Sequence, residues 1–192
     1  MKRLIIPIFL CVLLLTACGK GGGEDNYRAF AERLNKLESL SFTAKVRAEY
    51  EHKTARFGLS YEEDGEGGRV TVLAPELIRG VSARVKPGSS TLEYDSVVLD
   101  TGSLDSFGLS PLSSLPAMLR AMRLGHLDSI WEEDGKTVVT LEPDDELRCT
   151  VWLSKPDMHP LRAELITDGR VTVFVDIGDW TEGAPTQAAP SE

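Results

Sequence analysis

The sequence predicts a mainly β (α+β) fold, in which a strongly curved antiparallel sheet of about ten or eleven short strands carries two amphipathic helices on its apolar face. Three observations predict it. Apolar and polar residues alternate over many short runs, two Asp-Gly pairs mark tight hairpins, and two stretches carry apolar residues at helical spacing. Both helical stripes need a partner, and a sheet that wraps around them supplies it. A β-sandwich is the alternative fold.

The first helix is predicted behind the candidate caps Asp25 and Asn26. Its apolar stripe consists of Tyr27, Phe30, Leu34 and Leu37. The period then changes to two, which is typical of a half-buried antiparallel strand. Such a strand is predicted from Phe42 to Tyr50, and the alternation is repeated from Ala55 to Tyr61.

Further strand-like runs follow a Gly-rich turn, at about Arg69–Leu73, Leu77–Val85 and Thr91–Asp100. A second short helix interrupts them. Ser114 suits its N-cap, Pro116 its first turn and Gly125 its C-terminal cap. Its apolar face is formed by Leu115, Met118, Leu119 and Met122.

Strands then resume around two hairpin turns, Asp134-Gly135 and Asp168-Gly169, because Asp-Gly readily adopts the positive φ angles of a two-residue turn. In this half of the chain Trp152, Ile166 and Phe174 fall on the face opposite the main apolar alternation. They mark either a docking patch or a second covered layer, or they are scattered surface side chains.

Composition and charge exclude several classes of protein. The chain has 192 residues, of which 42% are hydrophobic, and this composition argues against a collagen-like or wholly disordered protein. It carries 21 basic and 30 acidic residues, for a net charge of −9, without a cluster of Lys and Arg. A nucleic-acid partner is therefore not expected.

The N-terminus resembles a bacterial lipoprotein signal. Lys2 and Arg3 precede an apolar run from Leu4 to Leu15, which is too short to span a bilayer of ~30 Å. The following Leu15-Thr16-Ala17-Cys18 resembles the lipobox, and this resemblance implies acylation of Cys18, including palmitate. We expect a signal peptide at 1–17, a Gly-rich tether at 18–25, a folded domain at 26–181 and a disordered tail at 182–192. The expected location is extracytoplasmic, with a lipid anchor in the cell membrane.

Cysteine and metal chemistry are not expected in the folded domain. Cys11 leaves with the signal and Cys18 takes the lipid, so that Cys149 remains alone, and its place on an alternating apolar face indicates a small core residue. The three His residues are scattered, which indicates no metal site. The acidic pair Asp144-Asp145 is interpreted as a solvated turn rather than a Ca²⁺ site. No cofactor is expected.

From Tyr27 to Trp180 the order of elements resembles the LolA-like superfamily, which includes outer-membrane lipoprotein-sorting proteins and sporulation and germination lipoproteins. Two stretches carry this resemblance, 37–42 leading into the first long strand and 152–165 near the end. The resemblance implies an unclosed β-barrel with a helical lid, and the domain at 26–181 is then a LolA-like domain. It also implies a non-catalytic binder of a lipid or lipoprotein acyl chain, or, as in the germination-type members, a protein-docking lipoprotein with an envelope partner.

The residues expected to line the apolar concavity come from strands and lid. They are Phe42, Val46, Tyr50, Phe57 and Leu59 from the strands and Leu115, Met118, Leu119 and Met122 from the lid. The same residues are equally suited to fill a dry core.

One stretch points to an enzyme instead. Val97-Val98-Leu99-Asp100-Thr101-Gly102-Ser103 resembles the aspartic-protease signature, whose chemistry needs two aspartates that share one proton. The sequence contains only one copy of this signature, so a protease would have to be a homodimer, and this is the enzymatic alternative. An ordinary strand-ending turn at Asp100 is favoured over it.

Overall fold

The computed structural model describes residues 22–65, 67–86, 89–95, 97–102 and 110–183. The predicted signal peptide, Cys18 and the tail beyond Gly183 lie outside the described residues. In chain order the elements are α2 (Gly22–Asn35), β1 (Ser39–Glu49), β2 (Thr54–Asp64), β3 (Gly67–Ala74), the 3₁₀ turn η1 (Glu76–Ile78), β4 (Ser82–Lys86), β5 (Ser89–Tyr94), β6 (Val97–Gly102), α3 (Pro111–Leu124), β7 (His126–Glu133), β8 (Lys136–Glu142), β9 (Leu147–Leu153), β10 (Pro160–Thr167) and β11 (Arg170–Gly183).

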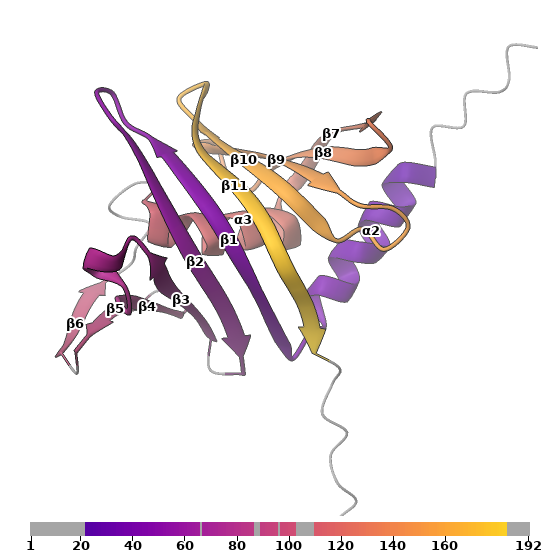
Figure 1. Ribbon diagram of the computed structural model, residues 1–192. Coiled ribbons are helices and arrows are strands. Elements are labelled where there is room, and N and C mark those ends of the chain that lie inside the picture. The colour runs from indigo at the N-terminus through magenta and orange to yellow at the C-terminus, as the bar shows by residue number, and fades with distance from the viewer. Residues whose placement is uncertain (1–21, 66, 87–88, 96, 103–109, 184–192) are drawn as a thin grey trace, which may run out of the picture.

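The described strands form one antiparallel sheet in the order β6-β5-β4-β3-β2-β1-β11-β10-β9-β8-β7 (Figure 1). The first and last strands, β1 and β11, pair in the middle and join the two halves of the chain. β6 and β7 form the two edges, and no pairing between them is present in the described part of the chain. The sheet is therefore an unclosed, strongly curved barrel, as predicted.

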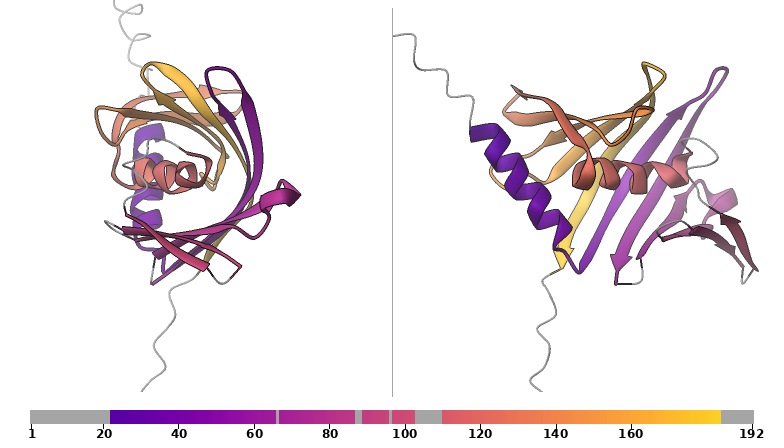
Figure 2. Two further views of the ribbon diagram at one scale, coloured as in Figure 1. Left: turned by 90° about the vertical axis from the view of Figure 1, so that its left-hand side faces the viewer. Right: turned by 180° about the vertical axis from the view of Figure 1, so that it is seen from behind.

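Both helices lie on the concave side of this sheet. The sheet curls around α3, whereas α2 crosses the open side at one end (Figure 2). Along β1 the residues that face the helices are buried and their neighbours are more exposed, which is the alternation that the sequence predicts. The buried members of β1 are Leu40, Phe42, Ala44, Val46 and Ala48.

The two Asp-Gly hairpins are confirmed. Asp134 and Gly135 connect β7 to β8 with φ angles of 48° and 73°, and Asp168 and Gly169 connect β10 to β11 with φ angles of 51° and 71°. A two-residue hairpin turn of type I′ requires a positive φ angle at both of its central residues.

Two predicted strands differ from the structure. The run Thr91–Asp100 is two strands, β5 and β6, because the chain reverses after Tyr94, with Asp95 at a φ angle of 48°. The run Leu77–Val85 begins as the 3₁₀ turn η1, which follows Pro75, and continues as a strand only from Ser82. Proline and a residue with positive φ, here Gly80 at 87°, are both incompatible with a continuous strand.

The ends of the helices and of the domain also differ. α3 begins at Pro111 with Ser110 as its N-cap, not at Ser114, because Ser110 and Ser113 form a reciprocal capping box. α2 begins at Gly22, inside the expected tether, with Glu24 and Asp25 in its first turn, where acidic residues stabilise a helix. It ends at Asn35, so that Leu37 lies beyond it. β11 continues to Gly183, two residues past the expected end of the domain.

Candidate functional site

The apolar concavity of the half-barrel is built from cross-strand rows of side chains. In one row Phe42, Tyr61, Val70 and Ala83 are successive partners across β1, β2, β3 and β4. Each of these side chains is buried. The row points at the helices, because residues that are partners in register share one face of a sheet.

Helix α3 fills this concavity. Leu115 and Met118 have no exposed surface, and the small residues Ala117, Ala121 and Ser114 on other sides of the helix are buried too. A helix that is buried nearly all round belongs to the interior of a fold. α3 is thus a plug surrounded by the sheet (Figure 2) rather than a lid that covers it from outside.

Helix α2 packs against α3 and closes one end. The Tyr27 hydroxyl donates a hydrogen bond of 3.0 Å to the Met122 carbonyl oxygen on α3. Burial raises the pKa of Tyr27 well above its usual range, and the nearby Cys149 contributes to a smaller extent. The phenol therefore stays neutral and serves as a fixed polar link between the two helices.

The structure brings most of the predicted lining residues together in one apolar cluster. Those with at most 2% exposure are Phe42, Val46, Leu59, Leu115, Met118, Leu119 and Met122. Phe57 is half-buried and packs against this cluster. These side chains contact one another in a packed interior.

Tyr50 does not join the predicted lining set. β1 ends at Glu49, and Tyr50 begins the turn to β2, with 42% of its surface exposed. The Lys53 ammonium lies 5.4 Å from the centre of the Tyr50 ring. The alternation of β1 extends to this position in the sequence, but the strand stops one residue before it.

Sequence reasoning did not identify Trp180 as a member of the site. Its ring stacks on Phe42 with 5.1 Å between centroids, and Phe42 stacks on Tyr61 at the same distance. The alternation along β11 does not reveal this contact, because the pairing with β1 shifts between Ser41 and Thr43 and changes the face that the last residues present.

A polar pair lies at the end of α3. Arg123 donates to both carboxylate oxygens of Glu63 on β2, over 2.8 and 3.0 Å, and Tyr61 donates to one of them over 3.2 Å. Burial, together with the Glu63 carboxylate, raises the pKa of Tyr61 above its usual range. This cluster fixes the C-terminal end of α3 to the sheet.

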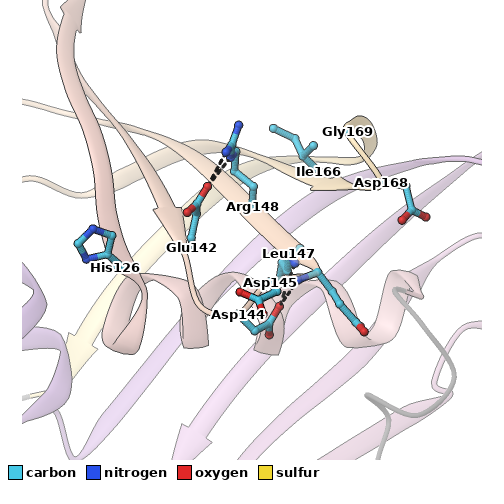
Figure 3. Close-up of a pocket in the computed structure, with 10 residues that line it drawn as sticks. His126, Glu142, Asp144, Asp145, Leu147, Arg148, Ile166, Asp168 and Gly169 are labelled. Atoms are coloured by element: carbon cyan, nitrogen blue, oxygen red, sulfur yellow. Dashed lines mark hydrogen bonds and ion pairs between the residues drawn. The ribbon is translucent and has the colours of Figure 1, made fainter.

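The acidic residues considered for Ca²⁺ line an open hollow of about 580 Å³ together with His126 and Ile166 (Figure 3). Asp144 accepts hydrogen bonds from the backbone N–H of Glu146 and Leu147 and pairs with Arg120 at 2.8 Å. Arg148 donates to Glu142. Within the described residues no group of three or more His, Cys, Asp or Glu side chains is placed to hold a metal ion.

Asp100 and Cys149 are the two remaining residues that the sequence offers for chemistry. Asp100 is exposed on the edge strand β6, with its Thr and Gly neighbours in the same strand rather than in a turn. Cys149 is fully buried in β9, and burial raises the pKa of its thiol to about 12, so that the thiol stays protonated. Buried cysteines of this kind are inert.

Two of the three apolar residues on the outer face lie in hollows. Phe174 lines a groove rich in cations, and Ile166 lines the acidic hollow. Trp152 lies beneath the Arg162 guanidinium, 5.1 Å from its ring centre. All three are half-buried.

Comparison with known proteins finds similar folds among solved structures. No family model and no curated protein matches the sequence. A solved DUF1329 family protein from Desulfovibrio piger is 12% identical, with a TM-score of 0.51, and the match covers 86% of this chain and 93% of that one. A LolA superfamily protein from Nitrosomonas europaea is 13% identical, with a TM-score of 0.46 and coverage of 80% and 92%. The lipoprotein LppX from Mycobacterium tuberculosis is 13% identical, with a TM-score of 0.39 and coverage of 85% and 97%.

The described fold is an unclosed antiparallel barrel of eleven strands that encloses a helix, and it is similar to the fold of the DUF1329 family protein from Desulfovibrio piger. Neither of the two described helices combines the length and the apolar character that crossing a bilayer requires.

Proposed function

We propose that the chain is a membrane-anchored bacterial lipoprotein that binds a lipid, or the acyl chain of another lipoprotein, inside its half-barrel without catalysing a reaction on it. The observation that carries the proposal is the position of α3. The apolar interior of the unclosed sheet is filled by a separate helix, so that moving this helix opens an apolar trough without breaking the pairing of the strands.

The side chains of α3 suit such a displacement. Met118 and Met122 are flexible and polarizable, and they pack against apolar partners of varied shape. Phe42, Val46 and Leu59 lie on the sheet beneath and would face an acyl chain in place of the helix. Each buried CH₂ group of such a chain contributes about 0.8 kcal/mol.

A crevice gives an approach to this interior. It measures about 440 Å³ and lies between α2 and the loop that joins β9 to β10. Phe30 and Met158, both members of the buried cluster, line it. An apolar chain that enters here meets core side chains directly.

Uptake of the fluorescent fatty acid 11-dansylundecanoic acid by residues 19–192 tests the binding proposal. The fragment retains every described contact, and we expect a saturable, blue-shifted emission. Glu63→Gln should accelerate uptake because it weakens the link between α3 and the sheet, whereas Glu24→Gln, which makes the same change of charge in an exposed pair, should not. Absence of saturable uptake in all three proteins contradicts the proposal.

Lipid anchoring is supported by the lipobox-like sequence that ends at Cys18. Metabolic labelling with palmitate tests it, and the chain offers a matched control. Label should be incorporated into the wild-type chain and into Cys11→Ser and be lost in Cys18→Ser. Equal labelling of both variants would contradict anchoring at Cys18.

A further inference from the structure

β11, β1 and β2 lie side by side in the middle of the sheet (Figure 1). Cationic side chains gather on the outer, convex face of these strands. They surround a groove of about 730 Å³, which we call the convex groove. Its charged lining residues are Lys45, Arg47, Arg56, Arg162 and Asp176. Four cations against one carboxylate contrast with the net charge of −9 of the whole chain.

Two of these cations are held in place by aromatic rings. The Arg47 guanidinium lies 3.8 Å from the centre of the Phe174 ring. Arg162 lies between Phe174 and Trp152, at 5.9 and 5.1 Å. Each also pairs with a glutamate two residues along its own strand, Glu49 and Glu164. Stacking fixes a guanidinium while its N–H edge still donates hydrogen bonds.

The other two cations have no close ion pair, although Asp176 is the register partner of Lys45. Lys45 and Arg56 are exposed, and neither forms an ion pair with another described residue. Lys45 precedes Arg47 by two residues along β1, and Arg56 is the register partner of Arg47 on β2. Spacings along and across strands place these cations about 5 to 7 Å apart.

The same spacing is found between alternate side chains of an extended polypeptide, about 6.6 to 6.8 Å. Carboxylates at every second position of an extended segment therefore match the cations of the convex groove. Next to them, Gly58 and Ala74 are register partners and contribute only small side chains to the lining. A polypeptide backbone can approach the sheet closely at this point.

We propose that the convex groove docks an extended acidic segment of a partner protein. A recessed groove favours a polypeptide over a membrane, because a flat bilayer contacts the most protruding side chains and does not enter a hollow. An extended anionic bilayer would also face the rest of this acidic chain, whose net charge is −9, whereas a peptide contacts the cationic groove alone. The inference concerns the outer face of the sheet and is independent of lipid binding on the inner face.

Fluorescence anisotropy of a short fluorescein-labelled peptide of alternating glutamate and serine, added to residues 19–192 in low-salt buffer, tests this inference. The fragment contains both helices and the whole described sheet. We expect saturable binding that weakens with added salt. The same peptide with lysine in place of glutamate should not bind.

Charge reversal separates the groove from the rest of the surface. The double substitution Lys45→Glu with Arg56→Glu should weaken binding at least roughly tenfold, because it removes two attractive charges and adds two repulsive ones. Lys36→Glu with Arg170→Glu makes the same change in net charge at exposed positions outside the groove, and it should leave affinity within about twofold.

Three outcomes overturn the inference: no binding of the glutamate peptide, equal loss of affinity in both double variants, or binding only to vesicles made of equal amounts of phosphatidylglycerol and phosphatidylcholine. The last outcome assigns the groove to a membrane surface. Circular dichroism of each variant identifies any loss that arises from misfolding.

Discussion

Arg123 and Glu63 form a two-pronged ion pair, with Nη1 and Nη2 of the guanidinium 2.8 and 3.0 Å from the two carboxylate oxygens. The pair joins the last turn of α3 to the end of β2, across 60 residues of chain. Both side chains are only about one-fifth exposed, at 19% and 23%. Paired guanidinium and carboxylate groups in this geometry are among the stronger polar contacts in proteins.

Replacing Arg123 by Met should therefore destabilise the protein by about 1 to 3 kcal/mol, since it leaves the Glu63 carboxylate half-buried without its cation. Urea unfolding followed by circular dichroism measures the change. Arg28→Met removes an exposed pair with Glu24 and should cost less than about 0.5 kcal/mol. An equal effect of the two substitutions would show that the Arg123 pair contributes nothing special.

Gly68 should not tolerate a side chain. A Cβ atom at this position of β3 would lie 2.3 Å from the Tyr61 hydroxyl and 2.8 Å from its ring, and the ring is held by its stack on Phe42. Gly68→Ala should cost about 1 to 3 kcal/mol in thermal or urea unfolding. Gly22→Ala, at a helical position with open space, should be neutral or stabilising by up to about 1 kcal/mol.

Stability should fall as the pH rises above about 9. The thiol of Cys149 has its pKa raised from 9.0 to about 12 by burial, and the pKa values of Tyr27 and Tyr61 are raised as well. Between the two thiol values the unfolded chain has released its proton while the folded chain retains it, so that the equilibrium shifts toward unfolding. Urea titrations between pH 8 and about 11 measure the slope.

Cys149→Val provides the control for this pH dependence. It should reduce the slope between pH 9.0 and about 12 because it removes the thiol, while the two tyrosines still titrate. A thiol reagent should label Cys149 only after unfolding, as expected for a fully buried side chain. Rapid labelling of the folded protein at neutral pH would contradict the assignment of Cys149 to the core.

Ser110 should contribute to the start of α3. Its hydroxyl oxygen accepts a hydrogen bond of 3.1 Å from the backbone N–H of Ser113, and the Ser113 hydroxyl accepts one of 2.8 Å in return. Ser110→Ala should cost about 1 kcal/mol in thermal unfolding, and Ser110→Asp should restore most of it. Ser114→Asp should not compensate, since Ser114 is buried inside the helix.

Sequence patterns predicted the parts of the fold that depend on neighbours in the chain. The alternation along β1, the apolar face of α3 and both Asp-Gly hairpins are local signals, and the structure confirms them. The start of α3 was misplaced because Ser110 and Ser114 both satisfy the preference for serine at an N-cap. Only the reciprocal bond with Ser113 distinguishes them.

The missing parts of the candidate site depend on contacts between distant residues. Arg123 and Glu63 are unremarkable charged residues in the sequence, and their pairing follows from how α3 enters the curved sheet. The stacking of Arg47 on Phe174 likewise requires the register between β1 and β11. Tyr50 was assigned to the lining because alternation does not reveal where a strand stops.

The early start of α2 bears on the proposed lipid anchor. The helix begins at Gly22, only four positions after Cys18. Even a fully extended backbone covers about 14 Å over that distance. If Cys18 carries the proposed acyl chains, the first helical turn, which contains Glu24 and Asp25, is confined to the headgroup region or just above it. Under that proposal, so short a connection limits the domain to partners and lipids at the surface of the same leaflet, and it favours neutral headgroups beneath the acidic turn.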